Sequence, residues 1–322
     1  MSVLVTGATG FIGSQVARSL LARGEEVVGI DNFSPYYDPI LKFARLKPLK
    51  DDKGFTFIEG DIADRDAMLG MAERHKGIDR IVHLAAQPGV RHSMVDPYIY
   101  VQTNVMGQLV MFELARQLGG LKHFVYASSS SVYGGNRKQP FAEEDRVDRP
   151  ISLYAATKRA DELLGETYTH LYKLKATGLR YFTVYGPWGR PDMSPWIFAK
   201  AIHEGSTINL FHLGFVKRDY SYIDDIVAGT IAALDKPPEQ PSHRLYNLAA
   251  NRAEDILHVV DLFEKAMGKK AVVELKPGEP GDMLETSADI SAATRDLGWT
   301  PKVTVAEGIP KFVEWFRSYN RL

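Results

Sequence analysis

Cysteine is absent from the 322 residues of this sequence. The chain therefore forms no disulfides, no thiolate metal sites and no cysteine nucleophile. This composition is compatible with a reducing compartment, and we expect a cytoplasmic protein. The first residues, MSVLVTG, run directly into an apolar strand and lack the basic-then-apolar order of a secretory signal peptide.

Long apolar runs and an excess of one charge are missing as well. No stretch approaches the roughly 18–20 apolar residues that span a bilayer, so we expect no membrane association. The 39 Lys and Arg residues nearly balance the 40 Asp and Glu residues, and such a chain has no broad positive field for nucleic acid. The nine histidines show no H-E-x-x-H or other paired metal-ligand spacing, so no metal site is expected.

Short β-branched runs alternate with longer amphipathic stretches in the first part of the chain. We predict helices at 11–23, 65–75, 98–118 and 153–173, and strands at 3–6, 27–31, 56–59, 80–84, 123–127 and 177–182. Near-continuous apolar strands alternating with helices are typical of a parallel sheet buried on both faces. The sequence therefore predicts an α/β fold with a Rossmann-type doubly wound sheet. After about residue 184 prolines interrupt this rhythm, which indicates a second, smaller α/β domain.

A glycine-rich turn, GATGFIG, spans residues 7–13. It follows a predicted strand and opens a predicted helix. Glycines at positions 7, 10 and 13 permit a tight turn, close approach of the backbone to a pyrophosphate, and close packing of helix on strand. The free amides at the start of the helix then face the phosphates. The pattern predicts a dinucleotide site.

Two acidic residues follow the next strands. Asp31 ends the second strand, 18 residues after Gly13, where a carboxylate accepts hydrogen bonds from the adenosine ribose. Such a carboxylate repels a 2′-phosphate, which favours NAD over NADP. Asp61 follows the third strand and is either an adenine contact or a helix N-cap, and the sequence leaves both interpretations open.

The motif YAATK places Tyr154 and Lys158 four residues apart. On a helix these positions share one face, so the phenol and the ammonium project together. A neighbouring cation favours the phenolate, which can act as a general base toward a sugar hydroxyl. A serine run, YASSSSVYG at 126–134, lies upstream, with Ser129 25 residues before the tyrosine.

The order of GATGFIG, HLAAQ (83–87), YASSSSVYG and YAATK resembles the extended short-chain dehydrogenase/reductases that act on nucleotide sugars, over essentially the whole chain. Within that group, the strings at 180–193 and 217–229 are similar to those of UDP-glucuronate 4-epimerases. The strings at 31–46 and 85–93 point the same way.

The resemblance implies tightly bound NAD, a UDP-sugar in the cleft, and reversible epimerisation at C4 through a 4-keto sugar. Tyr154 would take the proton of the C4 hydroxyl while hydride passes to the nicotinamide. Ser129 would hydrogen-bond the C4 oxygen, and Lys158 would bind the nicotinamide ribose. The resemblance further implies a homodimer formed through the helices near 98–118 and 153–173.

The resemblance also implies two domains and two sets of contacts. Residues 1–183 would bind NAD, with a segment at about 222–250 returning to that domain, and residues 184–322 would mainly bind the UDP-sugar. The expected NAD contacts are Gly7, Gly10, Phe11, Ile12, Gly13, Asp31, Asn32, Asp61, Ile62, Leu84, Ala85, Ala86, Asn104, Tyr154, Lys158 and Tyr181. The expected substrate contacts are Pro88, Arg91, Ser129, Ser130, Ser131, Tyr154, Thr183, Arg190, Arg218 and Asp282.

The residues after Ser129 separate this chain from sister reactions. Related dehydratases carry Asp-Glu there and decarboxylases typically carry Glu, whereas this chain has Ser130 and Ser131. With Thr183 and Arg190, these hydroxyls are expected to hold the C6 carboxylate of the sugar. Glu279, before Pro-Gly-Asp, departs from the basic residue that relatives often have, which weakens the expectation for the diphosphate site.

Three alternatives remain open at this level. One is a 4-epimerase of UDP-glucose/galactose or of an N-acetylated UDP-hexose. Another is a UDP-glucuronate decarboxylase. The third is a catalytically idle NAD-binding subunit, against which the retained Ser129, Tyr154 and Lys158 argue.

Overall fold

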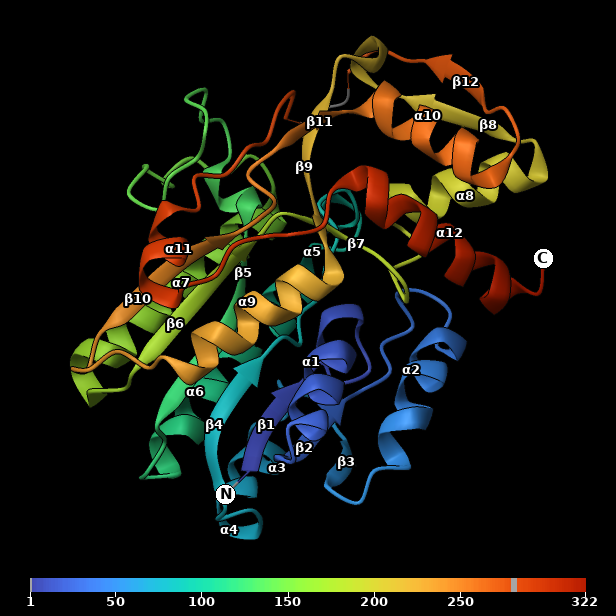
Figure 1. The fold of residues 1–322 in the computed structure, drawn as a ribbon. Helices are drawn as coiled ribbons and strands as arrows, with labels where there is room; N and C mark the ends of the chain where they lie inside the picture. Colours follow the sequence, from blue (N-terminus) through green and yellow to red (C-terminus); the bar gives the residue numbers. More distant parts are fainter. Residues whose placement is uncertain (1, 279–282) are drawn as a thin grey trace.

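Seven parallel strands form the central sheet of the protein, in the order β10-β6-β5-β4-β1-β2-β3 (Figure 1). The structure is a computed structural model that describes residues 2–278 and 283–322. The strands are β1 Ser2–Thr6, β2 Glu26–Asp31, β3 Phe55–Glu59, β4 Ile78–His83, β5 His123–Ser129, β6 Ala176–Tyr181 and β10 His243–Leu248. The first six end within two residues of the predicted bounds, and the predicted Rossmann-type α/β fold is confirmed. The strand order reverses between β1 and β4, and ligands of such sheets bind at that crevice.

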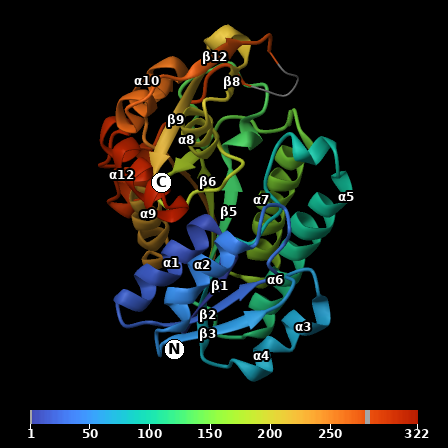
Figure 2. The same ribbon diagram turned by 90° about the vertical axis from the view of Figure 1, so that its right-hand side faces the viewer.

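Helices cover both faces of this sheet (Figure 2). One face carries α1 Phe11–Ala22, α2 Ile40–Lys50 and α9 Ile223–Asp235. The other carries α3 Arg65–Leu69, α4 Met71–Arg74, α5 Pro97–Tyr100, the π-helical turn η2 Val101–Met106, α6 Gly107–Gln117 and α7 Leu153–Tyr172. Successive side chains of a strand point to opposite faces, so Val3 and Val5 join the core under α1 and α9, while Leu4 joins the core under α6.

A smaller region follows β6. Its sheets are β7 Thr183–Tyr185, β9 Lys217–Tyr222 and β11 Ala253–Asp255, and β8 Thr207–Leu210 with β12 Val272–Leu275. Its helices are α8 Ser194–Glu204, α10 Ile256–Met267 and α12 Val305–Asn320, and η4 His212–Gly214 is a 3-10 turn within it. Helix α11 Ser291–Leu297 packs against β10 of the large sheet and against α9. Two further 3-10 turns, η1 His92–Met94 and η3 Ser130–Tyr133, lie in the first part of the chain. The chain returns to the large sheet at β10, which pairs in parallel with β6. The domain division at residue 183 stays a prediction.

Three helical segments differ from the sequence prediction. The helix expected at 65–75 is divided at Gly70, and the helix expected at 98–118 contains the π-helical turn. Helix α2 was not predicted at all. Its buried face includes Lys42 and Arg45, and Pro48 lies inside it, so the apolar periodicity that identifies a helix is absent there.

Candidate active site

A cavity of about 360 Å³ opens where the carboxyl ends of the parallel strands meet the smaller region. Its walls come from the turn between β1 and α1, the ends of β2, β4 and β5, the start of α7, and the segment after β6. This is the crevice at the reversal of strand order, the usual ligand position in doubly wound sheets.

The glycine-rich turn lines the inner part of this cavity. Gly7 has φ +68°, and a Cβ there would lie 2.9 Å from the amide nitrogen of Ala85. A Cβ on Gly13 would lie 2.0 Å from the carbonyl oxygen of Gly7. No larger residue fits either position, so the turn packs closely against the loop after β4 and the start of α1, and its three glycines line the cavity without side chains. This arrangement fits a pyrophosphate approaching the helix N-terminus.

Asp31 lies at the end of β2 and lines the same cavity. Its carboxylate accepts hydrogen bonds from the backbone amides of Thr9 (3.1 Å) and Phe33 (2.9 Å). The Lys42 ammonium lies 3.7 Å from Asp31 Oδ1. Burial lowers the pKa of Lys42, and the Asp31 carboxylate opposes that shift. Sequence reasoning missed Lys42, although it lies within the string at 31–46 that carried the resemblance.

Tyr154 and Lys158 reach the cavity from the first two turns of α7. Ser152 begins this helix, because its hydroxyl accepts a hydrogen bond from the amide of Ala155 at 3.1 Å. The tyrosine ring lies edge-on to Tyr100, with ring centroids 6.2 Å apart. Lys158 Nζ donates 2.9 Å hydrogen bonds to the carbonyl of Ala127 and to the carboxylate of Asp161. The predicted shared face of the phenol and the ammonium is therefore present.

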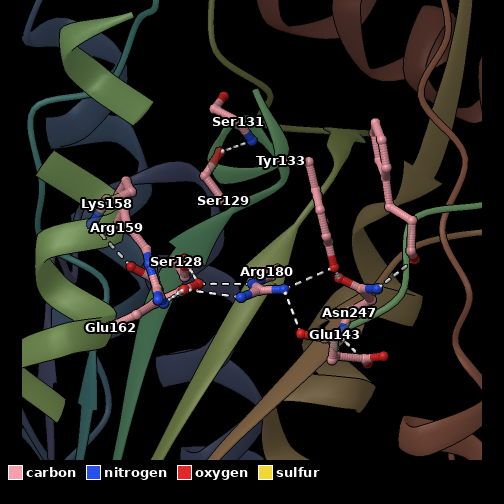
Figure 3. A network of polar contacts seen from close by, with 12 residues as sticks. Ser128, Ser129, Ser131, Tyr133, Glu143, Lys158, Arg159, Glu162, Arg180 and Asn247 are labelled. Carbon is pink, nitrogen blue, oxygen red and sulfur yellow. Dashed lines mark hydrogen bonds and ion pairs between the residues drawn. The ribbon is translucent and has the colours of Figure 1, made fainter. Parts of the chain in front are cut away.

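The serine run continues strand β5 and then turns. Ser129 lines the cavity and is the N-cap of η3, since its Oγ accepts a 3.2 Å hydrogen bond from the amide of Ser131 (Figure 3). Ser128 lines the cavity too, but its Oγ donates to Glu162 at 2.7 Å. Ser130 and Ser131 lie in η3 and are not among the residues that line the cavity.

Behind the serine run lies a buried polar cluster, which we call the structural network (Figure 3). Arg180 on β6 donates from Nε and Nη2 to the two carboxylate oxygens of Glu162 on α7, at 2.8 and 2.9 Å. Arg180 Nη1 also donates to the Tyr133 hydroxyl at 3.0 Å, which donates to Asn247 on β10 at 2.7 Å. With Ser128, these residues tie α7, β5, β6 and β10 together. No sequence motif indicated this cluster.

Arg190 lines the far wall of the cavity and forms a bidentate pair with Asp192. Its Nε and Nη2 donate to the two carboxylate oxygens at 3.0 and 2.6 Å. The Tyr36 hydroxyl donates to the same carboxylate at 3.0 Å. Burial raises the pKa of Tyr36, and the charge of Asp192 adds to that rise. Sequence reasoning identified Arg190 but neither of its partners.

Residues 3–249 match the sequence model of the NAD dependent epimerase/dehydratase family. The chain belongs to this family. It is 43% identical to UDP-glucuronate 4-epimerase 4 of Arabidopsis thaliana over 333 residues, covering 99% of this chain and 76% of that protein. It is 40% identical to a probable UDP-glucuronate 4-epimerase of Rhizobium meliloti (strain 1021) over 338 residues, covering 100% and 98% of the two chains.

A solved structure gives the same picture. The crystal structure of UDP-glucuronic acid 4-epimerase from Bacillus cereus in complex with UDP-glucuronic acid and NAD is similar to this chain with a TM-score of 0.92. The two are 34% identical, and the match covers 99% of this chain and 100% of that chain. The resemblance to UDP-glucuronate 4-epimerases predicted from the sequence is confirmed.

The fold brings most of the predicted site residues together. The following line the one cavity: Gly7, Gly10, Phe11, Ile12, Gly13, Asp31, Asn32, Asp61, Ile62, Leu84, Ala85, Ala86, Pro88, Ser129, Tyr154, Lys158, Tyr181 and Arg190. Their roles toward NAD and a sugar stay predictions. Asp61 also accepts hydrogen bonds from Asn32 Nδ2 (3.0 Å) and the Ala63 amide (2.8 Å), whereas the side chain that caps α3 is Asp64.

Several nominated residues lie elsewhere. Asn104 is buried, and its amide bonds the backbone of Gln87 in both directions and the Thr157 hydroxyl. It therefore fixes the loop after β4 to α7 and does not line the cavity. Thr183 is not a lining residue either, although its neighbours Phe182 and Val184 are.

The nominated substrate arginines of the loop after β4 and of β9 also lie outside the cavity lining. The Arg91 guanidinium lies over the ring of Phe211, 4.4 Å from its centroid, and so bridges the two sides of the cleft. Arg218 donates to the carbonyls of Lys217 and Leu284 at 2.9 and 3.3 Å. Asp282 and Glu279 lie outside the described residues.

His83 has a structural role at the end of the strand next to the glycine-rich turn. The ring is buried at the end of β4, with Nδ1 2.6 Å from the Thr6 hydroxyl. Burial, with a smaller effect of the Lys158 charge, lowers the pKa of His83 to about 3. Among residues 2–278 and 283–322, no group of three or more His, Asp or Glu side chains is placed to hold a metal ion. Within the same ranges no helix is long and apolar enough to cross a membrane.

Proposed function

We propose that this chain is an NAD-dependent UDP-sugar 4-epimerase that interconverts UDP-glucuronate and UDP-galacturonate through a 4-keto sugar. The observation that carries the proposal is the convergence of Ser129, Tyr154 and Lys158 on one cavity with Arg190 on its far wall. The confirmed relationship to UDP-glucuronate 4-epimerases supports the choice of substrate.

The bare backbone at Gly7 and Gly13 and the oriented Asp31 fit a dinucleotide, and these residues would hold its pyrophosphate and adenosine ribose. When bound, NAD supplies reversible hydride transfer at the sugar carbon. The residues of the chain then have to bind the sugar, hold its oxygen and move one proton.

Tyr154 is the group that removes the proton from the C4 hydroxyl and later returns it. Lys158 favours the phenolate form that this step requires. The Ser129 hydroxyl would donate to the C4 oxygen, which carries partial negative charge as the carbonyl forms and is consumed. Ser130 and Ser131 supply no carboxyl group. The acid and base that a dehydratase carries at these two positions are therefore missing from this chain.

Arg190 is the proposed partner of the C6 carboxylate. Its Nε and Nη2 edge is held by Asp192, which fixes the guanidinium plane against the cavity. A planar guanidinium with five N–H groups can pair with a second carboxylate through its other edge. The bound carboxylate is thereby fixed in orientation, which protects a 4-keto uronic acid, a β-keto acid, from losing CO₂.

The decisive experiment is incubation of the purified protein with UDP-glucuronate, followed by NMR of the products. We expect UDP-galacturonate, without added NAD and without net formation of NADH. A UDP-pentose as the main product would contradict the proposal in favour of a decarboxylase. Turnover of UDP-glucose but not of UDP-glucuronate would contradict the assigned carboxylate.

A homodimer and a cytoplasmic location are further parts of the proposal. Large apolar side chains are exposed on the α5 to α6 segment and on α7, including Tyr98 (84% exposed), Val101, Leu163 and Leu171. These two segments pack together, so their outer faces form a surface suited to a second copy. Light scattering at several protein concentrations tests the dimer, and Tyr98→Glu should shift it toward the monomer.

A further inference from the structure

Asp161 lies one helical turn after Lys158 on α7 and is completely buried. Its Oδ2 accepts a 2.9 Å hydrogen bond from Lys158 Nζ. Its Oδ1 is buried and, within the described part of the chain, accepts no hydrogen bond. We call Lys158 and Asp161 the pocket pair.

The pocket pair fixes the ammonium of Lys158 in space. An ammonium has three N–H groups, and two of those on Lys158 are used by the Ala127 carbonyl and the Asp161 carboxylate, both at 2.9 Å. Because Lys158 also lines the cavity, the third N–H remains for a group within it. One acceptor comes from β5 and the other from α7, so the ammonium is held between the strand of Ser129 and the helix of Tyr154.

We infer that Asp161 is a positioning residue of the epimerase, which holds the Lys158 ammonium toward the cavity and limits how strongly that ammonium favours the Tyr154 phenolate. The inference rests on the proposed function for the identity of the reaction. It assigns a role to a residue that does not itself line the cavity and that acts on Tyr154 through the cavity-lining Lys158.

The charged and titratable groups around the pair single out Asp161 as the anion that neutralises Lys158. On α7, Glu162 is paired with Arg180. From β4, His83 faces Lys158 as a neutral ring, since its pKa is lowered by burial. From β5, Tyr126 is buried, and burial first and then the two acidic residues of α7 raise its pKa, so it too is neutral.

Burial disfavours the charged forms of both Asp161 and Lys158. Burial raises the pKa of Asp161 to about 6, and the Lys158 ammonium offsets only part of that rise. Burial also opposes the charge on Lys158, but Asp161 and Tyr154 outweigh it and the pKa of Lys158 is raised. Near neutral pH the pair therefore presents little net charge to the cavity.

Removing the negative charge exposes the full charge of Lys158 to Tyr154. Positions 154 and 161 are two helical turns apart, about 10.5 Å along the axis. At an effective dielectric constant of about 20, a unit charge at that distance changes an ionisation equilibrium by about one pH unit. Asp161→Asn keeps an oxygen that can accept from Lys158, so it removes the charge and retains the hydrogen bond.

The experiment compares wild type, Asp161→Asn and Asp161→Ala as holoenzymes. We expect the acid-side fall of kcat/KM for UDP-glucuronate to move to lower pH by about one unit in Asp161→Asn. In Asp161→Ala, which also lacks the hydrogen bond, we expect the same shift and at least a tenfold faster loss of NAD during dialysis. Asp225→Asn is the matched control, because Asp225 is a buried carboxylate that accepts from the backbone amides of residues 302 and 303, away from the cavity.

A second measurement does not depend on turnover. The ultraviolet absorbance of phenolate is titrated with pH in each holoenzyme, and the same titration of its Tyr154→Phe derivative is subtracted. The midpoint of the difference should move to lower pH in Asp161→Asn and stay in place in Asp225→Asn. An unmoved midpoint in both Asp161 variants would overturn the inference even if the wild type epimerises UDP-glucuronate. If the wild type does not convert UDP-glucuronate but the midpoint still moves in Asp161→Asn, the proposed substrate is refuted and the role of Asp161 is retained.

Discussion

Asp161 and Glu162 are consecutive buried carboxylates on one helix, and they have opposite surroundings. Glu162 accepts four hydrogen bonds, two from Arg180 and one each from Arg159 and Ser128. Asp161 accepts one, from Lys158, and its second oxygen accepts none within the ranges described. Residues next to each other on a helix point about 100° apart, so one carboxylate enters the structural network and the other the cavity side.

The difference appears in the pKa of each group. Burial acts to raise the pKa of Glu162, but the hydrogen bonds and charge of Arg180 outweigh it and hold the pKa below its usual value. For Asp161 burial prevails and raises the pKa to about 6. A fully satisfied buried carboxylate fixes the packing of the elements around it, whereas an incompletely satisfied one with a raised pKa is typical of a functional site.

The largest expected effect is the loss of activity on substitution of Tyr154, which lines the cavity near Lys158. Tyr154→Phe removes the proposed acid–base group and keeps the ring, so the epimerisation rate should fall by about 10³-fold. NMR of the product mixture measures the rate, and urea denaturation should give an unchanged free energy of unfolding. A variant that keeps a tenth or more of the wild-type rate would exclude Tyr154 as the proton carrier.

The next effect is expected in the structural network. Arg180→Met leaves Glu162 buried with less compensation, and breaking a buried pair in this way costs about 3–5 kcal/mol of unfolding free energy. Urea denaturation measures this loss. The double variant Arg180→Met/Glu162→Leu removes the orphaned charge and should recover part of the stability. If the double variant is as unstable as the single one, the unpaired charge is not the cause.

Arg190 tests whether an arginine that is paired with Asp192 through one edge can still bind the substrate through the other. Arg190→Ala should raise KM for UDP-glucuronate by about 10–100-fold, the effect of losing a charge-assisted hydrogen bond, and should raise the UDP-pentose fraction. Thr183→Ala is the comparison, since Thr183 is not a cavity-lining residue. Slower turnover with an unchanged partition between hexose and pentose products would refute the protective role of the arginine.

The smallest expected effect is a change in how the unfolding free energy depends on pH, and it differs between Glu162 and Asp161. The pKa of Glu162 is lowered in the folded state, so its contribution to stability is present above its unfolded pKa, about 4.3, and is lost as the pH falls through the folded value. The pKa of Asp161 is raised, so the folded state takes up that proton first and the Asp161 contribution increases as the pH falls from 7 toward 4. Each changes the unfolding free energy by at most about 1.4 kcal/mol per pH unit.

Urea denaturation at pH 7, 6, 5, 4 and 3 separates these contributions. Glu162→Gln should lessen the loss of stability at the acid end. The unfolding free energy of the wild type should rise relative to that of Asp161→Asn as the pH falls from 7 to 5, because only the wild type has the Asp161 carboxylate to protonate. Parallel pH dependences of the two variants would contradict the contrast drawn between the two carboxylates.

The sheet and most of the cofactor cradle could be predicted because their signals are local. Strands buried on both faces are apolar throughout, and only glycine meets the backbone demands at Gly7 and Gly13. The spacing of Tyr154 and Lys158 is likewise fixed within one helix. Helix α2 escaped prediction because two of its buried side chains, Lys42 and Arg45, are charged.

The serine run shows what a sequence motif leaves open. The motif indicated a functional serine at Ser129, but not that the hydroxyl of Ser128, which also lines the cavity, donates to Glu162. Strand β5 continues two residues further than its apolar run, and alternation along the strand separates the two hydroxyls. Ser130 and Ser131 then leave the strand in η3, outside the cavity lining.

The sequence by itself determined the parallel sheet, the glycine cradle, the Tyr154–Lys158 face and the family, because each depends on neighbours along the chain. Only the tertiary structure decided which charges compensate one another. Asp192 holds Arg190, Arg180 holds Glu162, and Asp161 is left to Lys158 alone among the described cations within hydrogen-bond reach. Burial makes such pairings decisive, since a charge removed from water is stabilised only by the groups that packing brings against it.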